Sequence, residues 1–311
     1  MITVSVVICT RNRAGDLGAC LRSLGAQSRL PTQLVVVDAS DDDASRAVVE
    51  ATRAGGPIAE VRYLRSAARL TSQRNLGVAA ATGEVVTFLD DDVVLEPDYL
   101  GRIVELFEAD PMLGGAEGAV VTAPLVGRRR IANAFRRLFL MNSLGRPRGV
   151  KRSGFVAYDP WPRTVQPVTS LVGCNMSYRR EVFERFRFDQ WFDGYGLGED
   201  QDFSYRVGRT YRLVQTPFAR LVHRLSPVAR ERASALHEMT VVNHFYFVRK
   251  NLPPTPRTWL CALWSEVGEL LSVLKTADRA AIAGKLRGYR RVARTLGKPR
   301  PAAVAAKEAS S

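Results

Sequence analysis

The chain has 311 residues, of which 46% are hydrophobic and 24% are charged, an ordinary globular composition that can bury the core of one domain and an appendage. No apolar stretch reaches the roughly 18 residues of a membrane span, and four scattered cysteines without a CxxC pair exclude a disulfide framework or zinc knuckle. The net charge of +14 favours anionic partners, which are nucleotide phosphates, acidic lipid surfaces or nucleic acid.

The first ninety residues alternate strand and helix patterns at short intervals. β-Branched runs such as VSVVICT are typical of buried strands, which we expect at residues 4–10, 33–40, 60–66 and 84–90. Apolar residues at helical spacing predict helices between them, at residues 16–28, 42–55 and 70–83. Strands that alternate with helices of this length imply right-handed crossovers, so the predicted fold class is α/β with a mostly parallel central sheet flanked by helices.

The next part of the chain is less regular. We expect a helix at 97–111 and a strand at 116–124, followed by long loops over 127–168 around a short helix at 131–144. Further on, residues 170–186 read as a strand leading into a helix, and residues 198–209 open another helix.

The character of the sequence changes after residue 226. Two helical patterns follow, at 230–251 and 256–297, separated by a proline-rich break, and residues 298–311 have the composition of a disordered tail. We therefore predict a first domain at 1–225, a basic helical extension at 226–297 and a tail at 298–311. Because the basic residues of the N-terminus follow its apolar run, the reverse of a signal peptide, we expect a cytoplasmic protein.

The run TFLDDD places three adjacent carboxylates at the end of the fourth predicted strand. Ligands of parallel sheets bind beyond the carboxyl ends of the strands, where Thr10, Arg11, Asp38 and Asp90–Asp92 should meet. A D-x-D pair at such a position can hold one Mg²⁺ or Mn²⁺ ion against a diphosphate. The alternative is a solvated turn or a cap for the next helix.

Two other motifs could carry chemistry. Arg74 lies in the third predicted helix, where its guanidinium could pair with a phosphate or could simply face solvent. Glu199 and Asp200 follow the glycine-rich GYGLG at a helix start, where they could cap the helix or where one of them could act as a general base.

The motifs VSVVICTRNR, VVVDAS, SQRNLGVAAATGEVVTFLDDD, VGCNMSYRREVF and GYGLGEDQDFSYRV occur in this order. The set, which spans about residues 3 to 225, resembles the family 2 glycosyltransferases of the glycosyltransferase A fold. The family's D-x-D-D has Val93 in its fourth place here, so we expect only the D-x-D core to be used. Cys174 stands where small residues are usual.

The resemblance implies roles for individual residues. Asp92 would ligate the metal together with Asp90, and His223 lies where some relatives supply another ligand, although a single histidine is more often structural. Asp200 would be the catalytic base, supported by Glu199. The residues expected to contact the nucleotide sugar are Thr10, Arg11, Arg13, Asp38, Arg74, Asp90, Asp91, Gly173 and Asn175. Asp91, one residue out of phase on an extended backbone, should point away from Asp90 and Asp92.

The expected activity is a metal-dependent inverting transfer of a sugar from a nucleotide-diphosphate sugar to a hydroxyl of a glycan or lipid-linked acceptor. A sugar-phosphate nucleotidyltransferase is an alternative, but TRNRAGDL lacks the glycine-rich loop it would need. A basic nucleic-acid-binding module ranks low, because no aromatic-basic motif is present. Residues 131–140 and 244–290 could lie against an anionic membrane and present a lipid-linked acceptor, or could pack as an ordinary helical pair.

Overall fold

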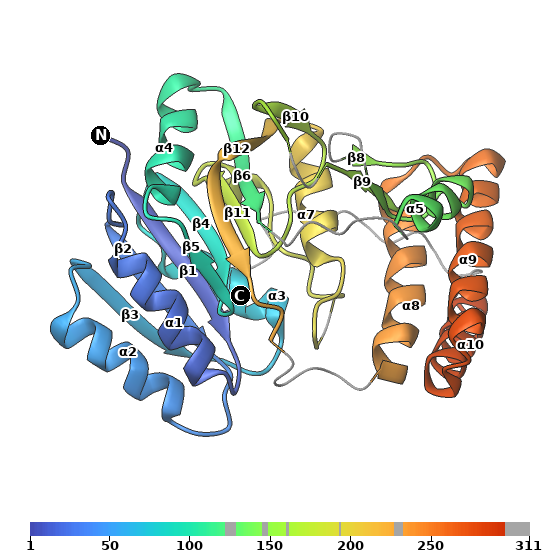
Figure 1. Cartoon of the computed structure of the whole chain (residues 1–311), viewed down its shortest axis with the longest axis horizontal. Helices are drawn as coiled ribbons and strands as arrows, with labels where there is room; N and C mark the ends of the chain where they lie inside the picture. The colour runs from blue at the N-terminus through green and yellow to red at the C-terminus, as the bar shows by residue number, and fades with distance from the viewer. Residues whose placement is uncertain (122–128, 145–148, 160–161, 193, 227–232, 296–311) are drawn as a thin grey trace. The chain divides into compact units, whose positions relative to one another are not determined.

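The computed structural model describes residues 1–121, 129–144, 149–159, 162–192, 194–226 and 233–295 (Figure 1). The chain divides into two compact units. Unit 1 comprises residues 1–122, 160–230 and 304–311, and unit 2 comprises residues 123–159 and 231–303. The domain boundaries predicted from the sequence stay a prediction, and the predicted disordered tail at 298–311 lies outside the described residues.

Unit 1 is built around one sheet, which has nine strands among the described residues. Eight of them follow the order β10-β12-β6-β11-β4-β1-β2-β3, and β5 pairs with β12. The strands are β1 Val4–Thr10, β2 Gln33–Asp38, β3 Glu60–Arg65, β4 Val85–Asp90, β5 Val93–Leu95, β6 Leu113–Val120, β10 Gln166–Val168, β11 Asn175–Arg179 and β12 Arg212–His223. The helices are α1 Ala14–Gly25, α2 Ala44–Gly55, α3 Leu70–Ala80, α4 Tyr99–Ala109, α6 Val182–Arg185 and α7 Glu199–Gly208.

The first half of this sheet confirms the predicted α/β arrangement. β1 pairs in parallel with both β2 and β4, and β2 pairs in parallel with β3. Alternate side chains of β1 enter two different cores, because successive residues of a strand point to opposite faces. Val6 and Ile8 pack with α1 and α4 on one face, whereas Val7 packs with residues of α3, β11 and α7 on the other.

The second half of the sheet departs from a purely parallel pattern. β11 runs antiparallel between β4 and β6, and β12 pairs in parallel with β6 but antiparallel with β5 and β10. β12 was not predicted as a strand, because Pro217 and the polar residues Gln215, Thr216 and Arg220 interrupt its apolar pattern. A register shift between Gln215 and Arg220 accommodates this interruption. The consequence is that β12 ends at His223, beside the end of β4.

Unit 2 combines four helices with a small sheet of order β7-β9-β8 in the described residues. The sheet contains β7 Ser143–Leu144, β8 Gly149–Val150 and β9 Val156–Tyr158, and the helices are α5 Arg129–Leu138, α8 Ala233–Asn251, α9 Pro256–Thr276 and α10 Arg279–Ala293. The single helical pattern expected over 256–297 is therefore wrong as one helix. Ala277 has a positive φ of 53°, and the Asp278 carboxylate accepts hydrogen bonds from the first turn of α10, so the chain turns there.

Helices α8 and α10 of unit 2 pack at close range through glycines. A Cβ atom on Gly284 would lie 2.2 Å from the Ser234 carbonyl oxygen, and one on Gly288 would lie 2.7 Å from Cβ of Val241. Small residues at these two positions are therefore required for the contact. None of the described helices has the length and apolar character needed to cross a bilayer.

A substitution at Gly77 tests the packing of α3 on the sheet. An added Cβ would lie 2.3 Å from Cγ1 of Val7, so we expect Gly77→Ala to lower the free energy of unfolding by about 1–3 kcal/mol, despite the better helix propensity of alanine. Gly15 in α1 has no neighbour within 4 Å of an added Cβ, so Gly15→Ala is the control and should be neutral or stabilising by up to about 1 kcal/mol. Urea denaturation of both variants measures the difference, and equal stability would contradict the packing.

Candidate active site

The carboxyl ends of three parallel strands meet at one edge of the sheet in unit 1. Thr10 at the end of β1 is in register with Asp38 at the end of β2, and Cys9 is in register with Asp90 at the end of β4. Residues that are far apart in the sequence are thereby brought to the same edge. This is the position at which open α/β sheets bind their ligands.

Asp90, Asp92 and His223 form a cluster at this edge. One ligand atom from each of the three lies within 4.8 Å of the other two. His223 Nε2 is 2.9 Å from Asp92 Oδ1 and 3.9 Å from Asp90 Oδ2. β5 explains this convergence, because the buried Val93 pairs with His223 across the β5–β12 ladder. Val93, which departs from the D-x-D-D pattern, thus serves the strand pairing that places the histidine.

The donor set fits a divalent cation. Asp92 Oδ1 is buried and has no hydrogen-bond partner in the described part of the chain, although His223 Nε2 lies 2.9 Å from it. Two ligands at right angles around one ion, each about 2.1 Å from it, are separated by about 3 Å. The two carboxylates suit Mg²⁺ or Mn²⁺, whereas an imidazole ligand is commoner around transition-metal ions than around Mg²⁺.

Other contacts hold Asp92 in the carboxylate form. Its second oxygen, Oδ2, accepts a 2.8 Å hydrogen bond from the Ser226 backbone N–H. Burial raises the pKa of Asp92, but His223, the Ser226 N–H and Arg13 outweigh it, and the net pKa is lowered. The pKa of Asp90 shifts in the opposite direction. Burial, with Asp92 and Asp200 nearby, raises its pKa against Arg74 and His223.

Asp91 turns to a different set of partners. Its Oδ2 accepts a 2.7 Å hydrogen bond from the Thr10 hydroxyl, and its Oδ1 lies 3.1 Å from Nη1 of Arg13. Burial raises the pKa of Asp91 to about 6, against the lowering effect of these two partners. Thr10, Arg13 and Asp91 therefore form a group beside the Asp90–Asp92–His223 cluster, and Asp91 ties the start of α1 to the end of β4.

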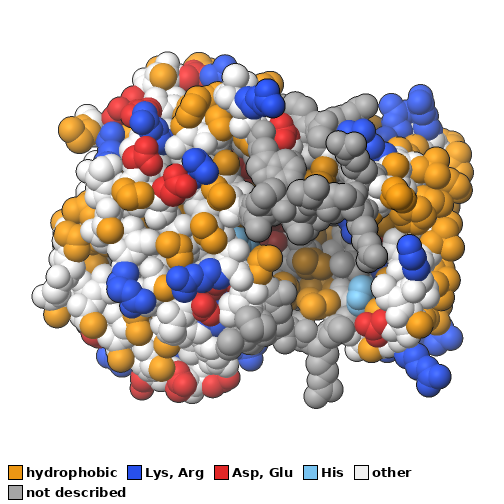
Figure 2. All heavy atoms as spheres, viewed as in Figure 1, with side chains coloured by type: hydrophobic (Ala, Val, Ile, Leu, Met, Phe, Trp, Pro, Cys, Tyr) orange, Lys and Arg blue, Asp and Glu red, His pale blue; other side chains and the backbone are white. Residues whose placement is uncertain are grey.

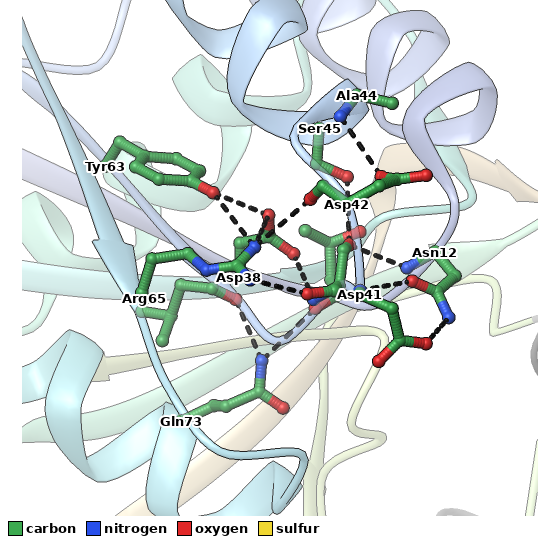
Figure 3. Close-up of polar contacts among 12 residues, drawn as sticks. Asn12, Asp38, Asp41, Asp42, Ala44, Ser45, Tyr63, Arg65 and Gln73 are labelled. Atoms are coloured by element: carbon green, nitrogen blue, oxygen red, sulfur yellow. Dashed lines mark hydrogen bonds and ion pairs between the residues drawn. The ribbon is translucent and has the colours of Figure 1, made fainter.

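Asp38 is fully buried at the end of β2 and is held from both sides (Figure 3). Its Oδ1 accepts a 2.7 Å hydrogen bond from the Ser40 N–H, and its Oδ2 accepts 2.7 Å and 3.2 Å hydrogen bonds from the Tyr63 hydroxyl and Arg65. Arg65 also donates to the Ser40 carbonyl. Asn12 closes the other side of this loop through two hydrogen bonds with Asp41.

Arg74 is buried on α3 and connects the two acidic segments of the site. Its guanidinium pairs with Glu199, lies 3.7 Å from Asp90, and donates a 3.2 Å hydrogen bond to the Gly173 carbonyl. Although burial lowers the pKa of an arginine, Glu199 and Asp90 raise that of Arg74 overall, so the group is charged. Burial, together with Asp200 and Asp90, raises the pKa of Glu199 to about 8, although Arg74 opposes the rise.

Asp200 lies in the first turn of α7, where the helix dipole favours a carboxylate. Its Oδ2 accepts a 2.8 Å hydrogen bond from the Gly173 N–H, and its Oδ1 accepts one of 2.8 Å from its neighbour Gln201. A Cβ on Gly173 would lie 3.0 Å from Nη2 of Arg74 and 3.3 Å from Asp200, so glycine lets this backbone pass between the two side chains. Asp200 stays partly exposed, whereas Glu199 is buried.

Two of the predicted site residues have other surroundings. Arg11 is exposed, and none of the contacts described above involves it. Asn175 is fully buried in β11, and its amide oxygen accepts a 2.9 Å hydrogen bond from the Gly118 N–H of β6. Cys174, beside it, is also buried and lies 3.7 Å from the Asn175 amide nitrogen.

Four residues that hold the site residues in place were not singled out from the sequence. Ser226 holds Asp92, Tyr63 and Arg65 hold Asp38, and Gln73 donates hydrogen bonds to the carbonyls of Thr10 and Val37. The only available signal was the polar alternation of Tyr63 and Arg65 at the end of the third predicted strand. A sequence pattern predicts that these two side chains share a face, but not which carboxylate they contact.

The sequence that builds this geometry matches a known protein family. The chain matches the family described as "Glycosyl transferase family 2" over residues 5–187, which is more than half of its length. The chain belongs to this family. The match includes the strand ends that carry Thr10, Asp38 and Asp90 to Asp92, as well as Gly173, and it ends before Asp200.

Curated relatives of this family 2 chain cover parts of it. An uncharacterized glycosyltransferase of Nostoc is 36% identical over 111 residues, which are 36% of this chain and 34% of the Nostoc protein. A glucosyl-dolichyl phosphate glucuronosyltransferase of Haloferax volcanii is 28% identical over 185 residues, which are 58% of this chain and 53% of that protein. The chain therefore spans between a third and about half of the length of these two relatives.

The fold is that of the glycosyltransferase A enzymes. A mannosyltransferase from Pyrobaculum calidifontis, solved in complex with GDP-Man and Mn²⁺, superposes with a TM-score of 0.56 and 19% identity. The superposition covers 96% of this chain and 82% of that one. The fold class expected from the sequence is thus confirmed.

Removal of one ligand tests the cation site. We expect Mn²⁺ to raise the unfolding temperature of the protein, and we expect Asp92→Asn to weaken the apparent Mn²⁺ affinity by at least about tenfold, because an amide is a poor ligand for a hard cation. Asp98→Asn, which changes an exposed carboxylate of the α4 start, is the control and should respond to Mn²⁺ as the wild type does. An unchanged Mn²⁺ response of Asp92→Asn would show that the ion binds elsewhere.

The buried Glu199 predicts a pH dependence of stability. Because its pKa rises from 4.5 to about 8 on folding, the folded state keeps a proton that the unfolded state loses, so stability should fall as pH rises through that interval. Glu199→Gln has a neutral side chain of the same shape and should lack this fall. Urea midpoints of both proteins, measured with chelator across the interval, give the difference. Parallel curves would mean that Arg74 keeps Glu199 ionised throughout.

Proposed function

We propose that this chain is a metal-dependent inverting glycosyltransferase that moves a sugar from a nucleotide-diphosphate sugar to an acceptor hydroxyl. The observation that carries the proposal is the convergence of Asp90, Asp92 and His223 within 4.8 Å at the edge where the family's nucleotide-binding strands end. Membership of family 2 supports the transfer chemistry, and the bound GDP-Man and Mn²⁺ of the Pyrobaculum neighbour support the donor and the metal.

The cation would be held by Asp90, Asp92 and His223. A bound Mg²⁺ or Mn²⁺ would supply Lewis-acid stabilisation of the negative charge that develops on the departing diphosphate. The Ser226 N–H fixes the Asp92 carboxylate, and β5 fixes His223, so the chain itself orients the ligands.

Donor binding would use the strand ends around the same edge. Asp38 would face the base, supported by Tyr63 and Arg65, which fix its carboxylate. Thr10 and Arg13 would border the phosphates through their contacts with Asp91. Arg74 is already engaged by Glu199, Asp90 and the Gly173 carbonyl. Arg74 would therefore hold these groups in position, in addition to making the phosphate or base contact that the resemblance implies.

Asp200 is proposed as the general base that takes the proton from the attacking hydroxyl. Of the two neighbouring carboxylates, Asp200 is the one that solvent reaches, and hydrogen bonds from Gly173 and Gln201 fix its orientation. Glu199 is buried against Arg74 and would support the start of the helix. A base on the acceptor side is what a single displacement with inversion requires.

The acceptor is proposed to be a glycan or a lipid-linked sugar. The Haloferax relative supports the lipid-linked class, since its name gives a glucosyl-dolichyl phosphate as the molecule on which it acts. That the protein acts in the cytoplasm, where nucleotide sugars would be its donors, stays a prediction.

Substitution of the base gives the direct test. Asp200→Asn should keep the affinity for the nucleotide sugar but lower turnover by roughly 10²-fold or more, because the amide cannot accept the proton. Asp202→Asn is a control on the same helix. Asp202 is paired with Arg206 inside the protein, so its variant should lose stability but keep the turnover of the folded fraction.

Turnover is measured as release of nucleoside diphosphate with metal and an acceptor panel. Near-normal turnover of Asp200→Asn would overturn the assignment of the base. Release of pyrophosphate from a sugar phosphate and a nucleoside triphosphate would instead indicate a nucleotidyltransferase and would overturn the proposed reaction.

A further inference from the structure

Helix α9 of unit 2 exposes one continuous apolar face. Its six exposed apolar side chains recur with the spacing of a single helical face, and their exposed fractions run from 42% for Trp264 to 70% for Leu260. We call these residues the α9 face: Leu260, Leu263, Trp264, Val267, Leu271 and Leu274. The face extends over most of a 21-residue helix. Single exposed leucines are ordinary, but a row of this length marks an interaction surface.

Both glutamates of α9, Glu266 and Glu269, point into unit 2. Glu266 is buried, and its carboxylate lies 2.7 Å from His244 Nδ1 and accepts a 2.9 Å hydrogen bond from the Tyr289 hydroxyl. The buried Lys285 lies 3.4 Å from both Glu266 and Glu269. Burial raises the pKa of Glu266, but His244, Lys285 and Tyr289 more than reverse this, so the carboxylate is held in its charged form.

This arrangement is the reverse of a helix on an ordinary globular surface. There, charged side chains face water and leucines face the core. In α9, the partners in α8 and α10 neutralise both acids of the helix inside the unit, which leaves the leucines outside. The network thus fixes the rotation of α9 about its axis.

A neighbouring helix extends the apolar surface within unit 2. The Trp264 indole N–H donates a 2.8 Å hydrogen bond to the Leu138 carbonyl at the end of α5, and the Trp264 ring stacks on Phe139. Leu138 itself is 65% exposed. The apolar surface is therefore held at a defined position by packing and not by a loose side chain.

Charge is concentrated in the same unit. Residues 123–159 and 231–303 contain 22 Lys+Arg against 6 Asp+Glu, a net charge of +16, whereas the remaining residues contain 23 against 25, a net charge of −2. All of the excess positive charge therefore belongs to unit 2. Exposed cations flank the α9 face, with Arg257 before it and Lys275 and Arg279 after it.

We propose that the α9 face of unit 2 docks on an anionic lipid bilayer. The surface combines the two attractions that an interfacial helix uses, since apolar side chains enter the acyl boundary while the surrounding Lys and Arg contact acidic headgroups. Figure 2 shows hydrophobic side chains gathered over α9 and α10 with Lys and Arg around them. The docking is peripheral, because none of the described helices is suited to span the bilayer.

The net charge of unit 2 favours an anionic bilayer over a second copy of the chain as the partner of the α9 face. An isologous dimer through the α9 face would bring together two units of net charge +16, and the exposed side of α9 offers no acid to relieve their repulsion. An anionic bilayer relieves the same charge and covers the same leucines. The proposal stands apart from the proposed sugar transfer, because it rests only on residues of unit 2.

Vesicle flotation of the full-length protein tests the proposal without any assay of activity. The protein should float with vesicles of equal parts phosphatidylcholine and phosphatidylglycerol and should stay behind with phosphatidylcholine alone. The double variant Leu263→Glu, Leu271→Glu should lower the partition coefficient by roughly tenfold or more, because it removes apolar burial and adds repulsion. Both positions are exposed, so the fold should persist, as circular dichroism can verify.

Thr276→Glu is the matched control. It adds one negative charge to the same helix at an exposed position outside the α9 face, as the single variant Leu271→Glu does within the face, so its flotation should fall much less than that of Leu271→Glu. Flotation that the double variant leaves unchanged, or no flotation with the anionic vesicles, would overturn the proposal. A dimer of the wild type in solution that the double variant converts to a monomer would also overturn it, by assigning the face to a second copy.

Discussion

The crowding of acids at one edge of the sheet is the constraint on which the rest of the site depends. Asp90, Asp91, Asp92, Glu199 and Asp200 gather there, and like charges at short range in a partly buried place cost free energy unless cations compensate them. Arg13 compensates Asp91, Arg74 lies against Glu199 and approaches Asp90, and the raised pKa of Glu199 lets this carboxyl keep a proton. Asp92 is left facing His223 with an oxygen that lacks a hydrogen bond in the described residues. A divalent cation at this point would complete the balance.

The arrangement of the strands determines which of these charged residues meet. Parallel strands bring Thr10, Asp38 and Asp90 to one edge, and β12 returns beside β5 to add His223. Arg74 joins α3 to the start of α7, so a single guanidinium links the cation site to the segment of the proposed base. The strand ends, the Asp90–Asp92–His223 cluster and the start of α7 contain charged groups in mutual contact. A substitution in one of them should therefore alter the others, and the effects of substitutions within this set on stability should not be additive.

Local patterns were sufficient for much of the fold. β-Branched runs predicted β1, β2 and β4, and the polar residues that end these strands predicted where Asp38 and Asp90 would lie. Long-range pairing was not predictable in this way. β12 has no clear apolar period, and its antiparallel register with β5, which decides that His223 faces Asp92, depends on two strands more than a hundred residues apart. The pairing of Arg74 with Glu199 was likewise not predictable from local patterns. The turn at Ala277 contains no glycine or proline that would predict it.

We infer that His223 and the Asp90–Asp92 pair bind one cation. Pulsed electron paramagnetic resonance of Mn²⁺ bound to the protein with a nucleoside diphosphate tests this most directly, because it detects the nuclear coupling of a directly bound imidazole nitrogen. If His223 binds the ion, the wild type should show a nitrogen coupling that disappears in His223→Gln while Mn²⁺ remains bound. Bound Mn²⁺ without nitrogen coupling in the wild type, or coupling that persists in His223→Gln, would contradict it.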